Sequence, residues 1–328
     1  MNLDLDAIIS EIVASGVSPV AAEAGANLVD SWISEKGSQD MTRRVIAVEL
    51  GFMLWLDDLT VAIGVQDAVF HEALGHLGGE WKSAKEPKKD ARGRETSWWN
   101  EDVWRRELSS GPQVGLYALA LQRATYIERK TGRKFVFDEP NPRILIRAAV
   151  KANPVRFWPS DPTDPETPEI FSFDQAALDS IANGIRAKAA QIRCARRAGL
   201  VPWQLPGDHC FSFGRTCQFY DKYCKTRVHP IVLDANDKII AKFDANDPAA
   251  QAALPYIDPD KLSNPDLVII SASQYKTASS CLEKYRIQNG SLVEETKEES
   301  LALDTGTAMH AGLAEFYRQV KTWQEKTA

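Results

Sequence analysis

The residues best suited to chemistry begin with an acid at the end of an apolar run. Asp67 follows Val61, Ile63 and Val65, which alternate with smaller or polar residues. A period of two with branched side chains predicts a strand. In such a strand Asp67 lies on the same face as the three apolar residues.

A second acid and a lysine follow a short distance along the chain. A glycine-containing turn is expected over residues 75–79, leading to a strand that carries Glu80-Trp81-Lys82. Glu80 and Lys82 then share one face, and Trp81 takes the other. Two carboxylates and one ammonium can thus converge, and carboxylate oxygens are suitable ligands for a hard divalent cation. The strand pair is therefore a candidate metal site.

A helix is predicted to follow this strand pair. Residues 109–112 have the sequence Ser-Ser-Gly-Pro, which is typical of a helix start with proline in the first turn. Gln113 and Tyr117 lie at positions i and i+4, so they share one face of that helix.

This set of residues resembles the PD-(D/E)XK nuclease superfamily, and in particular its RecB/AddB-like branch. Asp67 matches the family's Asp, and Glu80 and Lys82 match its acidic-x-Lys pair. Gln113 and Tyr117 match its Gln-x-x-x-Tyr helix motif. An acidic-x-Lys triplet alone is common, and the order and spacing of the whole set carry the resemblance. Without it, the same residues are an ordinary hairpin with a surface ion pair.

Two features depart from the family pattern. Gln66 stands at the position of the family's proline, where members often vary. Residues 306–310, Gly-Thr-Ala-Met-His, resemble the family's Gly-x-x-x-His helix motif, which implies that His310 lies at the metal site. This motif normally precedes the Asp and acidic-x-Lys strands, but here it follows them. A circular permutation, a fragment of a tandem array, or joined neighbouring reading frames would each explain the permuted order.

The cysteines form a second candidate group: Cys194, Cys210, Cys217, Cys224 and Cys281. Cys210, Cys217 and Cys224 lie in a loop-rich segment that resembles the C-terminal cysteine segment of iron–sulfur AddB-like nucleases. There a fourth cysteine belongs to a Ser-x-Ser…Cys…Tyr motif, which residues 271–285 match with Cys281. The resemblance implies an iron–sulfur cluster, with zinc or unligated thiols as alternatives. Cys194 is expected to be packed within a helix.

Composition excludes little. The chain has 328 residues and a net charge of −6, and no apolar run is long enough to span a membrane. Residues 1–6 are acidic and lack a signal-peptide pattern, so a cytoplasmic location is expected. Basic stretches over residues 82–94 and 186–197 are either solvated or part of a nucleic-acid surface. Trp98, Trp99 and Trp104 either pack in the core or stack on bases.

A tempting zinc-protease motif is rejected. His71 and His76 flank an acid in the sequence His-Glu-Ala-Leu-Gly-His, but they lie at i and i+5. That spacing puts them about 140° apart on a helix, whereas a zinc-binding pair needs i and i+4 on one face.

The fold class predicted is α/β: a restriction-endonuclease-like mixed central sheet flanked by helices, with a cysteine-bearing C-terminal part. Three parts are expected: a nuclease core over residues 1–230, a linker over 231–267, and a helical segment over 268–328 resembling the N-terminal part of the family domain. The helices are predicted over 4–35 with a break near 16–19, 112 to about 130, 178–192, 273–285 and 307–323. Short strands are predicted over 45–50, 135–137 and 144–146.

The resemblance implies a metal-dependent DNA nuclease. Asp67, Glu80 and His310 would hold magnesium or manganese, and Lys82 would orient the attacking water. Gln113 and Tyr117 would position the lysine or the nucleic-acid backbone. An exonuclease acting in recombination, repair or phage DNA processing is expected, with a helicase or recombination protein as a further partner. The alternative is an inactive nuclease-like module that binds DNA or a helicase. Glu49 is either a further acid of the site or an exposed strand residue.

Overall fold

The computed structural model describes most of the chain in two long blocks and several shorter ones. The described residues are 3–84, 112–150, 155–158, 169–198, 210, 261, 264–282, 284–285 and 301–327. Within these residues no helix is both long and apolar enough to cross a bilayer.

The centre of the fold is a mixed nine-stranded sheet in the order β5-β4-β1-β2-β3-β6-β7, with β8 pairing with β6 and β9 with β2. Strands β1, β2 and β3 form an antiparallel meander, whereas β6 runs parallel to β3 and β9 parallel to β2. The strands are β1 Arg44–Asp57, β2 Thr60–Glu72, β3 Gly75–Ala84, β4 Thr125–Glu128, β5 Lys134–Phe135, β6 Arg143–Val150, β7 Arg156–Trp158, β8 Ile170–Ser172 and β9 Val268–Ser271.

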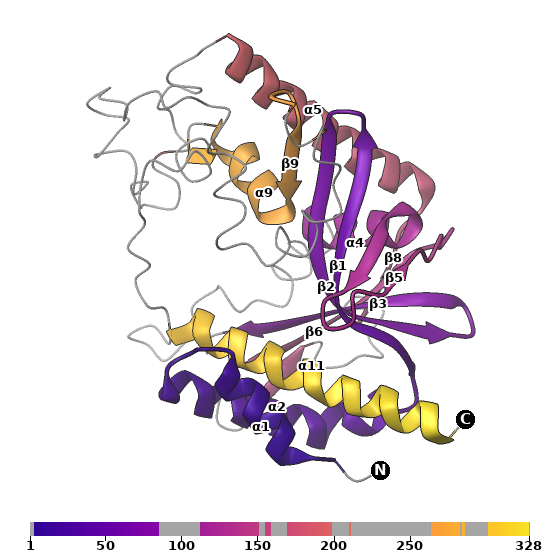
Figure 1. The fold of residues 1–328 in the computed structure, drawn as a ribbon, viewed down its shortest axis with the longest axis vertical. Helices are drawn as coiled ribbons and strands as arrows, with labels where there is room; N and C mark the ends of the chain where they lie inside the picture. The colour runs from indigo at the N-terminus through magenta and orange to yellow at the C-terminus, as the bar shows by residue number, and fades with distance from the viewer. Residues whose placement is uncertain are drawn as a thin grey trace, which may run out of the picture.

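Helices cover both faces of this sheet (Figure 1). One apolar cluster joins the sheet to α4 and α5, and a second joins it to α1, α2 and α11. The helices are α1 Leu5–Ala14, α2 Pro19–Asp40, α4 Pro112–Arg123, α5 Gln175–Arg197, α9 Ala272–Ser280 and α11 Leu301–Thr327. The predicted α/β class, a mixed sheet flanked by helices, is therefore confirmed.

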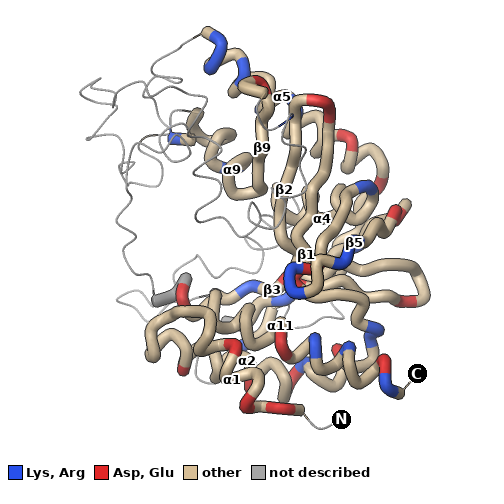
Figure 2. The backbone as a smooth tube through the Cα atoms, in the orientation of Figure 1, with Lys and Arg blue, Asp and Glu red and all other residues tan. Residues whose placement is uncertain are grey.

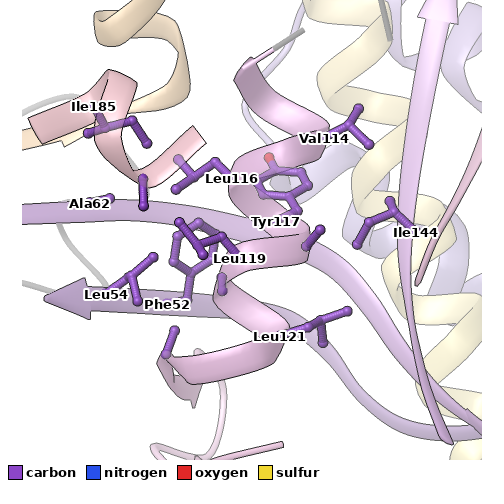
Figure 3. Packing of buried hydrophobic residues seen from close by; sticks show 14 of the residues in the cluster. Phe52, Leu54, Ala62, Val114, Leu116, Tyr117, Leu119, Leu121, Ile144 and Ile185 are labelled. Atoms are coloured by element: carbon purple, nitrogen blue, oxygen red, sulfur yellow. The ribbon is translucent and has the colours of Figure 1, made fainter. Parts of the chain in front are cut away.

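Strand β6 shows how the sequence divides between the two faces. Ile144 and Ile146 pack in the α4 cluster, while Leu145 packs in the α11 cluster. A continuous apolar run is what a strand needs when both of its faces are covered. Figure 3 shows the first face from close by, with Leu116 and Leu119 of α4 among the labelled core residues.

Strand β1 has an irregular backbone at Glu49, which lies opposite Asp67. Glu49 has a φ of +50°, and its neighbours Val48 and Leu50 pack in different clusters although a regular strand would place them on one face. Because Val48 pairs with Ala68 and Leu50 with Gln66, Glu49 lies across from Asp67. The long strand pair bends in this region (Figure 1), so that its two halves serve different helix layers.

Two predicted boundaries were wrong. The helix from Pro112 ends at Arg123 rather than near residue 130, and Thr125–Glu128 forms strand β4 against β1. The β-branched and aromatic residues of this segment suit a half-buried strand, and their partner lies far away in the sequence. The turn expected over residues 75–79 also lies earlier, since β3 begins at Gly75, whose φ is +101°.

The rejected zinc-protease motif proves to be part of the β2–β3 hairpin. His71 and His76 pair across the two strands, with ring centroids 5.3 Å apart. The segment is a strand hairpin and not the helix that a zinc-protease motif needs.

Candidate active site

The site is built around the carboxylate of Glu80 on β3, which is 3% exposed. Lys82, two residues later on the same face, forms an ion pair with Glu80 Oε1 and donates a hydrogen bond to Gln113 Oε1 at 3.1 Å. Gln113 Nε2 donates to Glu80 Oε1 and to the hydroxyl of Tyr117, both at 2.9 Å. The predicted strand residues and the predicted helix residues therefore form one hydrogen-bonded network.

Helix α4 holds its half of this network by packing rather than by charge. Tyr117 is buried, and its ring packs edge-on against Phe52 of β1 at 5.8 Å between centroids. The α4 residues around it are apolar and buried, because this helix lies flat against the sheet (Figure 3). Gln113, in the first turn, is the part of α4 that reaches the charged end of β3.

Asp67 belongs to the neighbouring strand β2 and connects the site to α11. Its Oδ2 accepts a hydrogen bond from the backbone N–H of Trp81 at 2.6 Å, which holds β2 and β3 together at the site. Its Oδ1 lies 3.1 Å from Nδ1 of His310, a residue 243 positions away in the chain on α11. The structure thus brings together all six residues that the sequence singled out for the site.

Helix α11 is also attached to the sheet at its C-terminal end. Gln324 accepts a hydrogen bond from the N–H of Val45 at 2.9 Å and donates to the carbonyls of Arg43 at 2.7 Å and Met41 at 3.1 Å. The last turns of α11 therefore lie at the start of β1, although the two are far apart in the sequence.

The electrostatics of the site depend on burial. Burial raises the pKa of Glu80 from 4.5 to about 7, with the Asp67 carboxylate adding to the increase and Lys82 opposing it. Burial alone would lower the pKa of His310, but the adjacent Asp67 carboxylate raises it above its usual value. Burial also raises the pKa of Tyr117 well above 10, so its hydroxyl stays neutral.

One atom of the site lacks a partner. Oε2 of Glu80 is buried and, among the described residues, accepts no hydrogen bond. A buried carboxylate oxygen without a partner is expensive to maintain, so it is expected to bind something in the working protein.

The donor set fits a hard divalent cation. The described part of the chain contains no ready-formed group of three or more His, Cys, Asp and Glu side chains. However, Asp67 and Glu80 supply carboxylate oxygens close to the imidazole of His310, and Glu80 Oε2 is unused. Oxygen ligands of this kind suit magnesium or manganese, with water completing the coordination.

The other candidate acid does not belong to this network. Glu49 forms ion pairs with Arg318 of α11 and, at 3.9 Å, with Arg129. It therefore stabilises the contact between α11 and the outer part of the sheet.

The cysteine predictions are only partly within the described residues. Cys210 is buried and Cys281 is partly buried at the end of α9, and neither forms a disulfide. Cys217 and Cys224 lie outside the described residues. Cys194 is exposed, so the prediction that it is packed was wrong: the buried face of α5 contains Ile192 and Ala195 instead.

The second basic stretch is mostly used in intramolecular contacts. Arg186 donates to the carbonyl of Leu56 at 2.8 and 3.0 Å, and Arg193 donates to the carbonyl of Leu59 at 3.1 Å. These arginines hold the β1–β2 turn, so they are not simply a solvated face, and the nucleic-acid surface stays a prediction. Figure 2 shows most of the positive charge of α5 at its far end, away from β3. Residues 85–111, with most of the first basic stretch and the three tryptophans, lie outside the described residues.

Gln66, next to the site, was not predicted from the sequence to be a buried and hydrogen-bonded residue. Gln66 is fully buried, and its Oε1 accepts a hydrogen bond from Tyr126 at 2.8 Å. It lies so close to Gly78 that a Cβ there would be 2.9 Å from Ile144 and closer still to the Gln66 amide. The signal was the Gly78-Gly79 pair, because glycines inside a strand mark a close approach of other groups.

Comparison with known proteins gives one family match. Residues 269–328 match the model of the PD-(D/E)XK nuclease superfamily. No curated protein and no solved structure matches the chain. The matched segment contains α11 and His310, so the segment that matches this family model contributes a side chain to the cluster on β2 and β3.

Proposed function

We propose that the protein is a metal-dependent nuclease that hydrolyses phosphodiester bonds in DNA. The observation that carries the proposal is the contact between His310, from the segment that matches the nuclease family, and Asp67, next to the acidic-x-Lys pair of β3. If Glu80 and Lys82 were only a chance ion pair on a hairpin, the histidine of the family motif would not be expected to lie beside them.

Each side chain has a role that follows from its position. Asp67, Glu80 and His310 would hold magnesium or manganese, which when bound polarises the phosphate and lowers the pKa of a coordinated water. Lys82 is placed beside Glu80 to orient the attacking water and to stabilise negative charge that develops on the phosphate. Gln113 bonds both members of this pair and keeps the lysine in position.

The permuted order of motifs is also part of the proposal. The end of α11 is bonded to the start of β1 through Gln324, where a family domain in the usual order would connect the two directly. This arrangement supports a circular permutation over a tandem fragment, since the C-terminal segment completes the site on its own chain. Membership of the RecB/AddB-like branch is proposed from the same motifs.

The cysteines are proposed to bind an iron–sulfur cluster that stabilises the C-terminal part of the nuclease. Cys281, at the end of α9, would join Cys210, Cys217 and Cys224 as a ligand. Protein purified without oxygen should be brown and contain iron, and Cys281→Ser should lose the iron and lower the melting temperature. Zinc in place of iron would mean that the cysteines bind a different stabilising metal. Colourless protein without metal would contradict a metal site at these cysteines.

The biological setting is proposed from the nuclease chemistry. We expect an exonuclease of the cytoplasm that acts on DNA during recombination, repair or phage DNA processing, with a helicase or recombination protein as a partner. The division into a core, a linker over residues 231–267 and a helical segment stays a prediction.

The test of the proposal is cleavage of linear DNA in the presence of magnesium or manganese. Lys82→Ala should reduce cleavage by about 100-fold or more, because it removes the charge that stabilises the transition state. Lys326→Ala, an exposed lysine at the end of α11, is the matched control and should cleave at the wild-type rate. Equal background digestion by all three proteins would contradict the enzyme and favour an inactive DNA- or helicase-binding module.

A further inference from the structure

Helix α11 is contacted at very short range on two opposite sides, within one turn of His310. On a helix, residues 306 and 310 lie about 40° apart, while residues 308 and 312 lie about 200° and 240° from residue 306. The first pair faces the sheet and the second pair faces α1 and α2.

On the sheet side, the contact is between Gly306 and β3. A Cβ added at Gly306 would lie 2.7 Å from the hydroxyl oxygen of Ser83, the residue after Lys82. A Cβ at residue 306 would therefore require either that the Ser83 hydroxyl rotates away or that α11 moves away from the strand that carries Glu80.

On the opposite side, the contact is with α2. A Cβ added at Gly25 would lie 3.1 Å from the backbone nitrogen of Met309 and under 3.0 Å from the Cβ of Ala308. One turn further, a Cβ at Gly312 would lie 2.8 Å from Val29 of the same helix. Backbone atoms and Cβ atoms cannot rotate out of the way, so these contacts define the separation of the two helices.

We propose that Gly25 and Gly306 are positioning residues for His310. Together they fix the depth of α11 between α2 and β3, and hence the 3.1 Å approach of His310 to Asp67. Both their effect on metal affinity and their effect on cleavage rest on the proposed metal site, but metal affinity can be measured without any cleavage.

The test compares two glycines of the same helix. Gly25→Ala should displace α11, whereas at Gly37 an added Cβ would meet its nearest atoms at 3.5–3.8 Å, which is ordinary contact. Both substitutions replace a helical glycine with alanine, so the gain in helix propensity is common to both. We expect Gly25→Ala to weaken Mn²⁺ binding, measured by calorimetry, by about 10-fold or more, because the positioning of a ligand is lost. Gly37→Ala should bind Mn²⁺ as the wild type does.

Compensating substitutions separate positioning from general damage. Adding Ala308→Gly to Gly25→Ala removes the opposing Cβ and should restore Mn²⁺ affinity and DNA cleavage. On the sheet side, Ser83→Ala removes the hydroxyl that Gly306→Ala would meet, so this double variant should also recover. If Gly25→Ala does not fold, the Gly306 and Ser83 pair decides the question.

The proposal is overturned if Gly25→Ala binds Mn²⁺ as tightly as Gly37→Ala, or if neither double variant recovers affinity. A wild-type protein that binds Mn²⁺ but does not cleave DNA would contradict the nuclease and leave the positioning of His310 to be judged on metal affinity alone.

Discussion

Two buried carboxylates, Asp40 and Glu80, have opposite surroundings. Asp40 ends α2 and is fully buried, and both of its oxygens are used. Oδ2 accepts from Trp32 at 3.2 Å and from Tyr317 at 2.6 Å, while Oδ1 accepts from Arg43 at 3.1 Å and also pairs with Arg147. Glu80 is almost as buried, but only one of its oxygens has partners.

The protonation of the two clusters follows this difference. Burial would lower the pKa of Arg147, but Asp40 and Glu169 raise it above its usual value, so that cluster is charged and internally neutralised. At Glu80 burial outweighs Lys82, and the pKa rises to about 7. The difference fits a structural role for the satisfied cluster and the proposed ligand-binding role for the unsatisfied one.

Breaking the satisfied cluster should have the largest effect on stability. Asp40→Ala leaves Arg147 buried without its main partner and should lower the free energy of unfolding by about 3–5 kcal/mol. Chemical denaturation measures this, with Asp30→Ala, an exposed acid of the same helix, as a control that should change little. A loss below about 1 kcal/mol for Asp40→Ala would contradict the stabilising role of the Asp40 cluster.

Neutralising the unsatisfied site should instead affect activity. Asp67→Asn and Glu80→Gln each remove a charged oxygen ligand with little change in volume, and each should reduce DNA cleavage by about 100-fold or more. Circular dichroism spectra should match the wild type. Substantial cleavage by both variants would mean that the active site lies elsewhere.

The raised pKa of Glu80 makes the stability of the protein depend on pH. The folded-state pKa of Glu80 is about 7 and its ordinary value is 4.5, so between these values the folded chain keeps a proton that the unfolded chain releases. The contribution of Glu80 to the free energy of unfolding is therefore greatest on the acidic side and is lost as pH rises toward 7, by on the order of 1.4 kcal/mol per unit of pKa difference.

This dependence should disappear in Glu80→Gln, which does not titrate. Without divalent metal, the stability of the wild type relative to Glu80→Gln should fall as pH rises from about 5 to about 8. Parallel stability profiles for the two proteins would contradict the raised pKa of Glu80.

The smallest effects are expected at two tyrosines, one in each cluster. Tyr317→Phe removes a hydrogen bond to a buried charged carboxylate and should lower stability by about 1.5–3 kcal/mol without changing the cleavage rate of the folded protein. Tyr117→Phe removes a neutral bond from Gln113, so stability should fall by about 0.5–1.5 kcal/mol and cleavage should slow several-fold. Urea denaturation and steady-state rates measure both, and the reverse pattern would contradict the division of roles.

Local patterns predicted the strand of Asp67, the shared face of Glu80 and Lys82, and the helix of Gln113. These features depend on periods of two or on i, i+4 spacing, which the sequence displays directly. His310 could be proposed only from its motif, since its contact with Asp67 crosses 243 positions.

The remaining features depend on distant partners. Strand β4 forms because it pairs with Leu50 to Met53 of β1. No local signal in the sequence marked the end of α4 at Arg123. The cluster of Asp40 draws on side chains from α2, β6 and α11, with no motif to connect them. These features were therefore determined by tertiary packing and not by local helix or strand propensity.

The most direct test of the account is a calorimetric titration of the metal-free protein with Mn²⁺, beside Glu80→Gln. If the unpartnered oxygen of Glu80 is kept for a cation, the wild type should bind Mn²⁺ and Glu80→Gln should bind it at least about 10-fold more weakly. Equal affinity in the two proteins, or no binding by the wild type, would contradict the central claim that this carboxylate is part of a metal site.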